Sequence, residues 1–346
     1  MSRLSILTPT YKHAAFLPAC LDSALAQAHR DWEMVLLDDG SPDDTPSVVR
    51  RYADPRIRYH RQDNLGLRGL GTTYNRALAL ANGDLVAILE GDDLWPPDKL
   101  ARLVPAFDDS RVVLAYGITR HVDAAGRETG DTTPTPRLLA RAPRDIVFND
   151  PPGSAVREMV SPDEGVFCYP VSVVIRRSAL DAIGGFRAVD DGHAVDTATF
   201  MTLALKGTFH FTPHVTGYWR RHPGQQNSSR ALESALRSDF RFVIDFLERH
   251  RDELPAPMPT IDGLRRRWAM RWAGVRIAAG RHLLLRRQWT DARREFLRAL
   301  DGPISPVRTV AACAGLACSY ARRDLEWLYR GAGRGDWRAF YDTSAR

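Results

Sequence analysis

Lysine, cysteine pairs and long apolar runs are scarce in this chain of 346 residues. Only three of its 48 basic residues are lysines, so arginine carries nearly all the positive charge. The four cysteines, at positions 20, 168, 313 and 318, form no CxxC pair. We expect them to be reduced and buried, as in a cytosolic protein.

No apolar run is long enough to predict a targeting or membrane-spanning segment. The patch from Leu4 to Leu7 is too short for a signal peptide. The longest mildly apolar run, Thr309 to Ala321, falls below the ~20 residues that a spanning helix needs. We therefore expect a cytoplasmic protein that is at most peripherally bound to the inner face of the cell membrane.

The balance of charge is mildly basic, with a formal net charge of +6 and an isoelectric point near 9.3. This suits an anionic ligand or membrane surface but is too weak to indicate nucleic acid. Eleven arginines and three acids lie between Asp262 and Arg298. They are either the solvated faces of a helical bundle or a contact for a membrane or a lipid-linked acceptor. The oligomeric state is left open.

The apolar run from Leu85 to Leu89 is followed by Glu90, Asp92 and Asp93. Such a run predicts a strand buried on both faces, and ligands bind at the carboxyl edge of open α/β sheets. Because crowded carboxylates repel one another unless a cation neutralises them, the cluster predicts a divalent metal site. The alternative is a polar turn that only ends the strand.

Strands and helices alternate over residues 1–118, which predicts parallel pairing by right-handed crossovers. We expect Pro9 to close the first strand. The remaining strands are expected at 32–37, 57–60, 85–89 and 112–118, and the helices at 15–27, 45–52 and 72–81. This half of the chain is typical of a nucleotide-binding α/β sheet.

Residues 119–228 are expected to complete the same domain as an acceptor half, with 129–160 as a flexible, proline-rich loop. A helix is expected from Asp196 to Leu205, with short strands around Phe209 and Tyr218. From residue 229 to 346 the pattern predicts only helices. The fold class is therefore α/β, with an all-helical C-terminal extension.

Further polar groups follow the other predicted strands. Tyr11 follows the first, and Asp38 and Asp39 follow the second. A carboxylate there can accept the N3–H of uracil or thymine, and Tyr11 offers a flat face to the base. A metal on Asp92 and Asp93 would neutralise a diphosphate. Together these groups predict a pocket for a nucleoside diphosphate sugar.

Over roughly residues 3–225 the chain resembles the family 2 glycosyltransferases, which have the GT-A fold, a Rossmann-like nucleotide-binding sheet. The order and spacing of short motifs carry the resemblance. They are Thr8-Pro9-Thr10-Tyr11, Asp38-Asp39-Gly40-Ser41, Asn64 with Gly66, Asn75, Glu90-Gly91-Asp92-Asp93 with Pro97, Gly184-Gly185-Phe186, Asp196, and Arg220 with His222.

The resemblance implies how the donor is held. Pro9 and Tyr11 would form the base pocket, and Asp39 would bind uracil. Asp93 would be the direct ligand of Mn²⁺ or Mg²⁺, and Asp92 would hold the ribose or the metal.

The resemblance also implies groups that act on the reaction. Arg220 and His222 resemble the late basic pair that closes over the diphosphate, and Asp196 falls near the position of the catalytic base. Asp196 is also a natural helix N-cap, and Asp190 and Asp191 are the alternative bases.

The chain departs from the family pattern at three positions. Val195 precedes Asp196 where a Glu-Asp pair is common, and Glu90 replaces an aspartate. Tyr74 stands where an arginine often precedes the helix asparagine, which leaves Arg68 or Arg76 to reach the phosphate.

The resemblance implies inverting transfer from a UDP-sugar or dTDP-sugar to a hydroxyl of a glycan or lipid-linked acceptor, in bacterial surface polysaccharide synthesis. A base removes the acceptor proton, and the metal and basic pair stabilise the departing diphosphate. One alternative is a sugar-phosphate nucleotidyltransferase, but the glycine-rich phosphate loop of that class is absent after the first strand. Another is a protein that binds nucleotide sugars without turnover.

Overall fold

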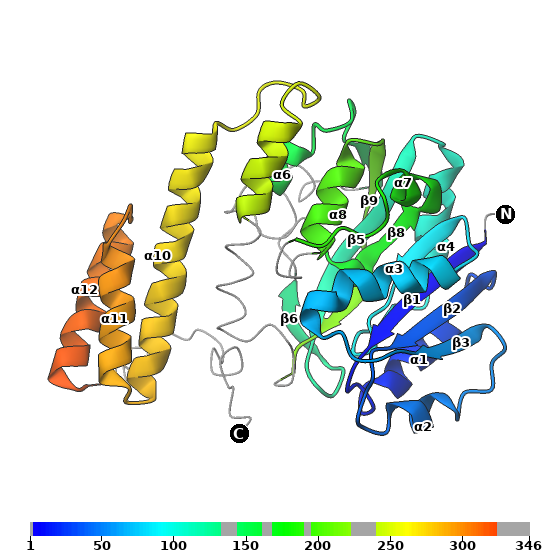
Figure 1. Ribbon diagram of the computed structural model, residues 1–346, viewed down its shortest axis with the longest axis horizontal. Helices are drawn as coiled ribbons and strands as arrows, with labels where there is room; N and C mark the ends of the chain where they lie inside the picture. The colour runs from blue at the N-terminus through cyan, green and yellow to red at the C-terminus, as the bar shows by residue number, and fades with distance from the viewer. Residues whose placement is uncertain (1–2, 133–143, 161–167, 190–194, 223–239, 324–346) are drawn as a thin grey trace. The chain divides into compact units, whose positions relative to one another are not determined.

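The computed structural model describes residues 3–132, 144–160, 168–189, 195–222 and 240–323 (Figure 1). Their contacts form two compact units. One holds the described residues up to His222 together with 240–258, and the other holds residues 259–323. The expected domain boundary at residues 228 and 229 lies outside the described part of the chain.

The first unit is built on a nine-stranded mixed sheet in the order β3-β2-β1-β4-β8-β5-β9-β7, with β6 paired to β5. Its strands are β1 (Leu4–Thr10), β2 (Trp32–Asp38), β3 (Ile57–Arg61), β4 (Leu85–Ile88), β5 (Val112–Val122), β6 (Glu128–Thr132), β7 (Ile146–Phe148), β8 (Val173–Arg176) and β9 (Thr208–Arg220). The first four strands pair in parallel, which confirms the predicted parallel pairing of these strands.

Helices cover the sheet of this unit (Figure 1). They are α1 (Leu17–Leu25), α2 (Thr45–Val49), α3 (Leu70–Leu80), α4 (Lys99–Leu103), α6 (Val156–Met159), α7 (Arg177–Ala182) and α8 (Val195–Ala204), with short 3₁₀ turns η1 (Leu67–Gly69), η2 (Val104–Asp108) and η3 (Pro170–Ser172). Every residue of β1 and β2 is buried, as expected of strands whose two faces are both covered. Residues 240–249 are helical as well.

Strand β1 continues through Pro9, contrary to the expectation that the proline ends it. Pro9 pairs with Leu37 of β2. Its carbonyl faces the opposite side, where it accepts the N–H of Gly91 at 3.1 Å, beyond the last β1–β4 pair, Leu7 with Ile88. Because the proline nitrogen points to that same side, Pro9 removes no donor from the β1–β2 ladder, and its missing N–H falls where the β1–β4 ladder ends.

The described parts of segment 129–160 carry regular structure, which corrects the prediction of one flexible loop. Strand β6 forms a hairpin with β5, and β7 pairs with β9. Asn149 anchors the segment, because its amide donates to the carbonyls of Ala204 and Gly207, both at 2.7 Å. Residues 133–143 lie outside the described residues.

A single strand, β9, replaces the two short strands expected around Phe209 and Tyr218. Its pairing with β5 shifts register between Gly117 and Thr119. Pro213 lies in this irregular stretch, where its missing N–H interrupts no regular ladder. The long strand carries Arg220 to the edge of the sheet where β4 ends.

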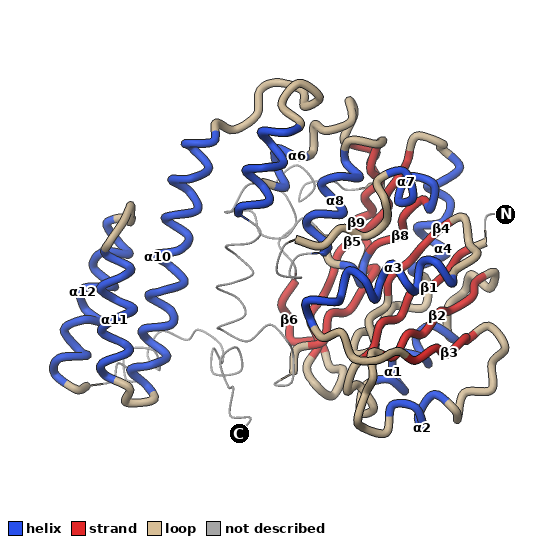
Figure 2. The backbone as a smooth tube through the Cα atoms, viewed as in Figure 1, coloured by secondary structure: helices blue, strands red, loops and turns tan. Residues whose placement is uncertain are grey.

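The second unit consists of α10 (Ile261–Leu285), α11 (Trp289–Leu300) and α12 (Pro306–Ala321), in agreement with the predicted helical extension (Figure 2). Its core gathers around Phe296 of α11. Gly280 and Gly315 admit the Phe296 ring, since a Cβ at either position would overlap it. None of the described helices is both long enough and apolar enough to cross a bilayer.

Candidate active site

The acidic turn after β4 is fastened to β1 by backbone hydrogen bonds. The N–H of Leu89 donates to the carbonyl of Leu7 at 3.0 Å, and Gly91 donates to Pro9 at 3.1 Å. Gly91 packs so tightly that a Cβ there would overlap the side chain of Thr10. The turn is therefore held in place at the carboxyl edge of the sheet.

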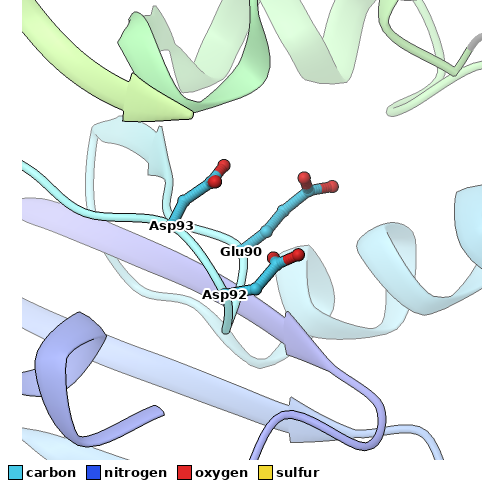
Figure 3. A group of neighbouring side chains, drawn as sticks. All are labelled: Glu90, Asp92 and Asp93. Carbon is cyan, nitrogen blue, oxygen red and sulfur yellow. The ribbon is translucent and has the colours of Figure 1, made fainter. Parts of the chain in front are cut away.

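Glu90, Asp92 and Asp93 bring their carboxyl groups together at this edge. Ligand oxygens of the three lie within 4.8 Å of one another. Figure 3 shows their side chains leaving the turn in the same general direction. Clustered carboxylate oxygens are the donor set that Mg²⁺ and Mn²⁺ prefer, so these residues fit a divalent cation.

Burial makes this cluster electrostatically costly without a cation. Burial, and then the charge of Asp92, raises the pKa of Glu90 to about 7. Burial, and then the charges of Asp92 and Glu90, raises the pKa of Asp93 well above its usual value. Because each negative charge penalises the next, the site favours a bound cation.

Asp92 is the one acid of the cluster that keeps a low pKa. Burial opposes its ionisation, but a hydrogen bond from His222 and the nearby His13 lower the pKa below its usual value. The Nε2 atom of His222 lies 3.1 Å from Oδ2 of Asp92. His222 was predicted from the sequence, whereas His13, with Nε2 at 3.8 Å from the same oxygen, was not.

Arg220 ties the end of β9 to the acidic turn. Its backbone N–H donates to Oδ1 of Asp93 at 2.9 Å, and its Nε donates to the carbonyl of Asp92 at 2.7 Å. Its Nη1 donates to the carbonyl of Ala124 at 2.8 Å. The side chain is only 2% exposed. Arg220 thus lies beside the acidic turn, and its guanidinium contacts the backbone of two turns.

Asp39 directly follows β2 and is a buried acceptor for the glycine-rich loop, residues 64–71. Its carboxylate accepts from Gln62 at 2.6 Å, from the N–H of Leu65 at 2.9 Å and from the N–H of Gly66 at 3.1 Å. The amide of Asn64 donates to its backbone carbonyl. These contacts hold the loop against the end of β2, so the predicted uracil contact would share this carboxylate with the loop.

The neighbouring Asp38 has a different environment. It is fully buried and accepts from Tyr59 at 2.7 Å, from Arg61 at 3.2 Å and from the N–H of Ser41 at 2.8 Å. These partners fix the turn after β2. Of the two adjacent acids, only Asp39 is partly accessible, at 7% exposure.

The other predicted donor-binding residues occupy the same edge or the loop beside it. Pro9 and Tyr11 lie at the end of β1, and the ammonium of Lys12 lies 5.1 Å from the centre of the Tyr11 ring. Arg68 is exposed in η1. Arg76 donates to Gln62 at 2.8 Å, so it contacts a partner of Asp39.

Asp196 lies in the first turn of α8, where its Oδ1 accepts the N–H of Thr197 at 2.9 Å. It is partly exposed, and burial raises its pKa. Its charge also contributes to the raised pKa of Glu90, which places it near the acidic cluster. The alternative bases, Asp190 and Asp191, lie outside the described residues.

Tyr74 supports the site in a way that the sequence analysis did not anticipate. Its hydroxyl donates to Glu90 at 2.6 Å, and its ring stacks on Phe186 at 4.8 Å between centroids. The adjacent Asn75 bonds to both the N–H and the carbonyl of Phe186. The one available signal was that Tyr74 and Glu90 both depart from the family pattern, and the structure pairs them.

The chain matches the family model described as "Glycosyl transferase family 2" over residues 5–184, which is more than half of its length. The chain belongs to glycosyl transferase family 2. An uncharacterised glycosyltransferase of Nostoc is 37% identical over 35% of this chain and 37% of its own length. An Escherichia coli protein described as a UDP-Glc:α-D-GlcNAc-diphosphoundecaprenol β-1,3-glucosyltransferase is 31% identical over 33% of this chain and 44% of its own length. The chain thus spans less than half of either relative.

Solved structures confirm the GT-A fold of this family 2 member. TarS of S. aureus, residues 1–349 in complex with UDP-GlcNAc, matches with a TM-score of 0.53 at 16% identity, over 96% of this chain and 93% of that chain. A mannosyltransferase of Pyrobaculum calidifontis in complex with GDP-Man and Mn²⁺ matches with a TM-score of 0.52 at 20% identity, over 99% of this chain and 84% of that chain. At these identities the match supports the fold alone.

Proposed function

We propose that this chain is an inverting, metal-dependent glycosyltransferase that moves a sugar from a UDP-sugar to a hydroxyl of a glycan or lipid-linked acceptor. The observation that carries the proposal is the buried cluster of Glu90, Asp92 and Asp93 at the carboxyl edge of a family 2 sheet. A dTDP-sugar is the alternative donor. Family membership favours glycosyl transfer over nucleotidyl transfer.

Each group at the edge has a proposed task. Asp92 and Asp93 would hold the divalent metal, Mn²⁺ or Mg²⁺, which when bound supplies positive charge against the diphosphate. His222 keeps Asp92 ionised, and Arg220 orients Asp93 through its backbone N–H. Pro9, Tyr11 and Asp39 would bind the nucleoside.

Asp196 is the proposed base. At the start of α8 its carboxylate would take the proton of the acceptor hydroxyl as the oxygen attacks the anomeric carbon from the side opposite the diphosphate. Attack from that side inverts the configuration. Its raised pKa makes it a stronger proton acceptor than an ordinary aspartate. Arg68 is the exposed cation proposed to meet the phosphates.

The setting is part of the same proposal. A relative whose description names UDP-Glc and the UDP-GlcNAc complex of TarS both support a donor of the UDP type. The diphosphoundecaprenol acceptor named for that relative supports bacterial surface polysaccharide synthesis. Because the mannosyltransferase binds GDP-Man, the nucleotide base of the donor has to be measured directly. We propose a cytoplasmic location for the reaction.

The first test is a thermal-shift screen of UDP, GDP and dTDP, each with and without Mn²⁺. We expect UDP to raise the melting temperature only with Mn²⁺, and Asp93→Ala to abolish that shift. Asp31→Ala is the matched control, because Asp31 is an exposed acid before β2, at the opposite edge of the sheet. If none of the nucleotides shifted the wild type, the proposal would lose its basis. If UDP does bind, an assay for release of UDP from a UDP-sugar distinguishes an enzyme from a protein that only binds nucleotide sugars.

A further inference from the structure

Positive charge is concentrated in the second unit. Residues 259–323 contain fourteen arginines and four acids, whereas the whole chain has a net charge of only +6. This unit therefore carries an excess of ten positive charges, and the rest of the chain is net negative. Such a separation indicates a partner of negative charge for the helical unit.

One face of α12 is exposed and apolar. Val307 is 81% exposed, Val310 is 70% exposed and Tyr320 is 62% exposed. The residues between them at the same helical spacing, Cys313, Ala314 and Ala317, are also exposed. We call these six residues the apolar stripe.

The opposite face of α12 packs against its neighbours. Ala312, Gly315 and Ser319 are buried there. Arg308 is the only charged residue between Pro306 and Ala321, and its guanidinium donates to the carbonyl of Met270 in α10. Arg308 is thus directed toward α10 and leaves the apolar stripe without a charge.

Arginines gather where the apolar stripe ends. Arg322 and Arg323 follow the last turn of α12, and both are exposed. The guanidinium of Arg293 on α11 lies 3.7 Å from the centre of the Tyr320 ring. Figure 2 shows α11 and α12 side by side. An apolar helix face with an aromatic residue and arginines at its end is the composition of helices that lie in a lipid interface.

We propose that the apolar stripe of α12 docks this protein on an anionic lipid surface. The side chains of the stripe enter the boundary between headgroups and acyl chains, and the arginines beside it contact lipid phosphates. A second copy of the chain is a poorer occupant, because two units with ten excess positive charges each would repel one another. The proposal concerns the location of the enzyme and does not depend on the identity of its donor.

The test is co-sedimentation of the full chain with lipid vesicles. Vesicles in which about a third of the lipid is phosphatidylglycerol are compared with vesicles of phosphatidylcholine alone. We expect binding to the first only, and weaker binding as salt is raised. Val310→Asp should lower binding about tenfold or more, because it places a charge in the middle of the apolar stripe.

Thr290→Asp is the matched control, since it adds the same charge at an exposed position of α11 outside the apolar stripe. It should change binding less than twofold if the stripe is the contact. Arg322→Gln with Arg323→Gln should weaken binding and reduce its dependence on salt. In every variant, UDP with Mn²⁺ should shift the melting temperature as it does in the wild type, which would show that the first unit is intact. This control keeps the test of lipid binding separate from the test of the proposed function.

Three results would overturn the proposal. The first is a wild type that fails to bind anionic vesicles. The second is a Thr290→Asp variant that weakens binding as much as Val310→Asp does. The third is a dimer in light scattering that Val310→Asp dissociates, which would assign the apolar stripe to a second copy.

Discussion

The Nε2 atom of His222 lies 3.1 Å from Oδ2 of Asp92, although 130 positions separate the two residues. The contact joins the end of β9 to the acidic turn after β4, and the hydrogen bond lowers the pKa of Asp92 against the effect of burial. His222→Ala should therefore raise the pKa of Asp92 and weaken Mn²⁺-dependent binding of UDP. We expect a loss of about 10- to 100-fold, typical of the removal of a group that orients a metal ligand.

Titration calorimetry of UDP at a fixed Mn²⁺ concentration measures this loss. His210→Ala is the control, since His210 lies on β9, the strand that leads to His222, and contacts Asp145 instead of the acidic turn. Equal losses in the two variants would show that the effect arises from damage to β9 and not from Asp92.

Asp196→Asn tests the proposed base. The amide cannot accept the acceptor proton, so kcat should fall about 10²- to 10⁴-fold. Binding of UDP with Mn²⁺ should stay within about twofold of wild type if Asp196 does not touch the nucleotide. Steady-state kinetics and calorimetry separate the two effects.

The alternative bases are tested in the same assay with Asp190→Asn and Asp191→Asn. If either of them abolished transfer while Asp196→Asn kept wild-type turnover, the assignment would move to that residue. If Asp196 only caps α8, Asp196→Asn would weaken the first turn of the helix and lower the melting temperature.

Asp39→Asn tests the proposed contact between Asp39 and the uracil ring of the donor. If Asp39 binds uracil, the variant should bind UDP about 10- to 100-fold more weakly, as expected for loss of a hydrogen bond to a charged group. Its affinity for pyrophosphate with Mn²⁺ should be unchanged, because pyrophosphate has no base. Calorimetry with both ligands distinguishes loss of the uracil contact from disorder of the loop, because a disordered loop would weaken the binding of UDP and of pyrophosphate alike.

Glu33 provides a prediction on acid stability. It is 2% exposed, and its carboxylate accepts from Ser5, from Arg58 and from the backbone N–H of Asn82. Burial alone would raise its pKa, but the hydrogen bonds, that of the Asn82 N–H first, lower the pKa below its usual value. A group with a lowered folded pKa stabilises the protein above its unfolded pKa and loses that effect as the pH falls through the folded value.

Glu33→Gln should therefore destabilise the protein by about 1.5–3 kcal/mol at neutral pH, the range for lost hydrogen bonds to a charged group. The difference from wild type should shrink below pH ~4.5, as the wild-type carboxyl becomes protonated in both states. Urea unfolding at a series of pH values measures it. A difference that stayed constant down to pH ~2 would mean that the charge of Glu33 plays no part.

Much of the first unit could be predicted from local pattern. The run from Leu85 to Leu89, its acids and the alternating helices specified parallel strands, because a strand buried on both faces needs a continuous apolar stretch. The same rule placed Asp39 and Asp93 at one edge. These inferences succeeded because period and strand polarity are local properties of the chain.

Local pattern failed where long-range pairing decides the structure. Pro9 continues β1 because its nitrogen faces the end of β4, and Asn149 orders a proline-rich segment by binding carbonyls more than fifty residues away. Neither relation is visible in a window of sequence.

The sequence by itself determined the alternation of strands and helices, the cluster of acids after the fourth strand and the helical character of the C-terminal residues. Tertiary structure alone decided that Arg220 and His222 meet Asp93 and Asp92, that Tyr74 donates to Glu90, and that one face of α12 stays exposed. The physical reason is that a side chain's partners, its burial and hence its pKa depend on which distant strands and helices pack beside it.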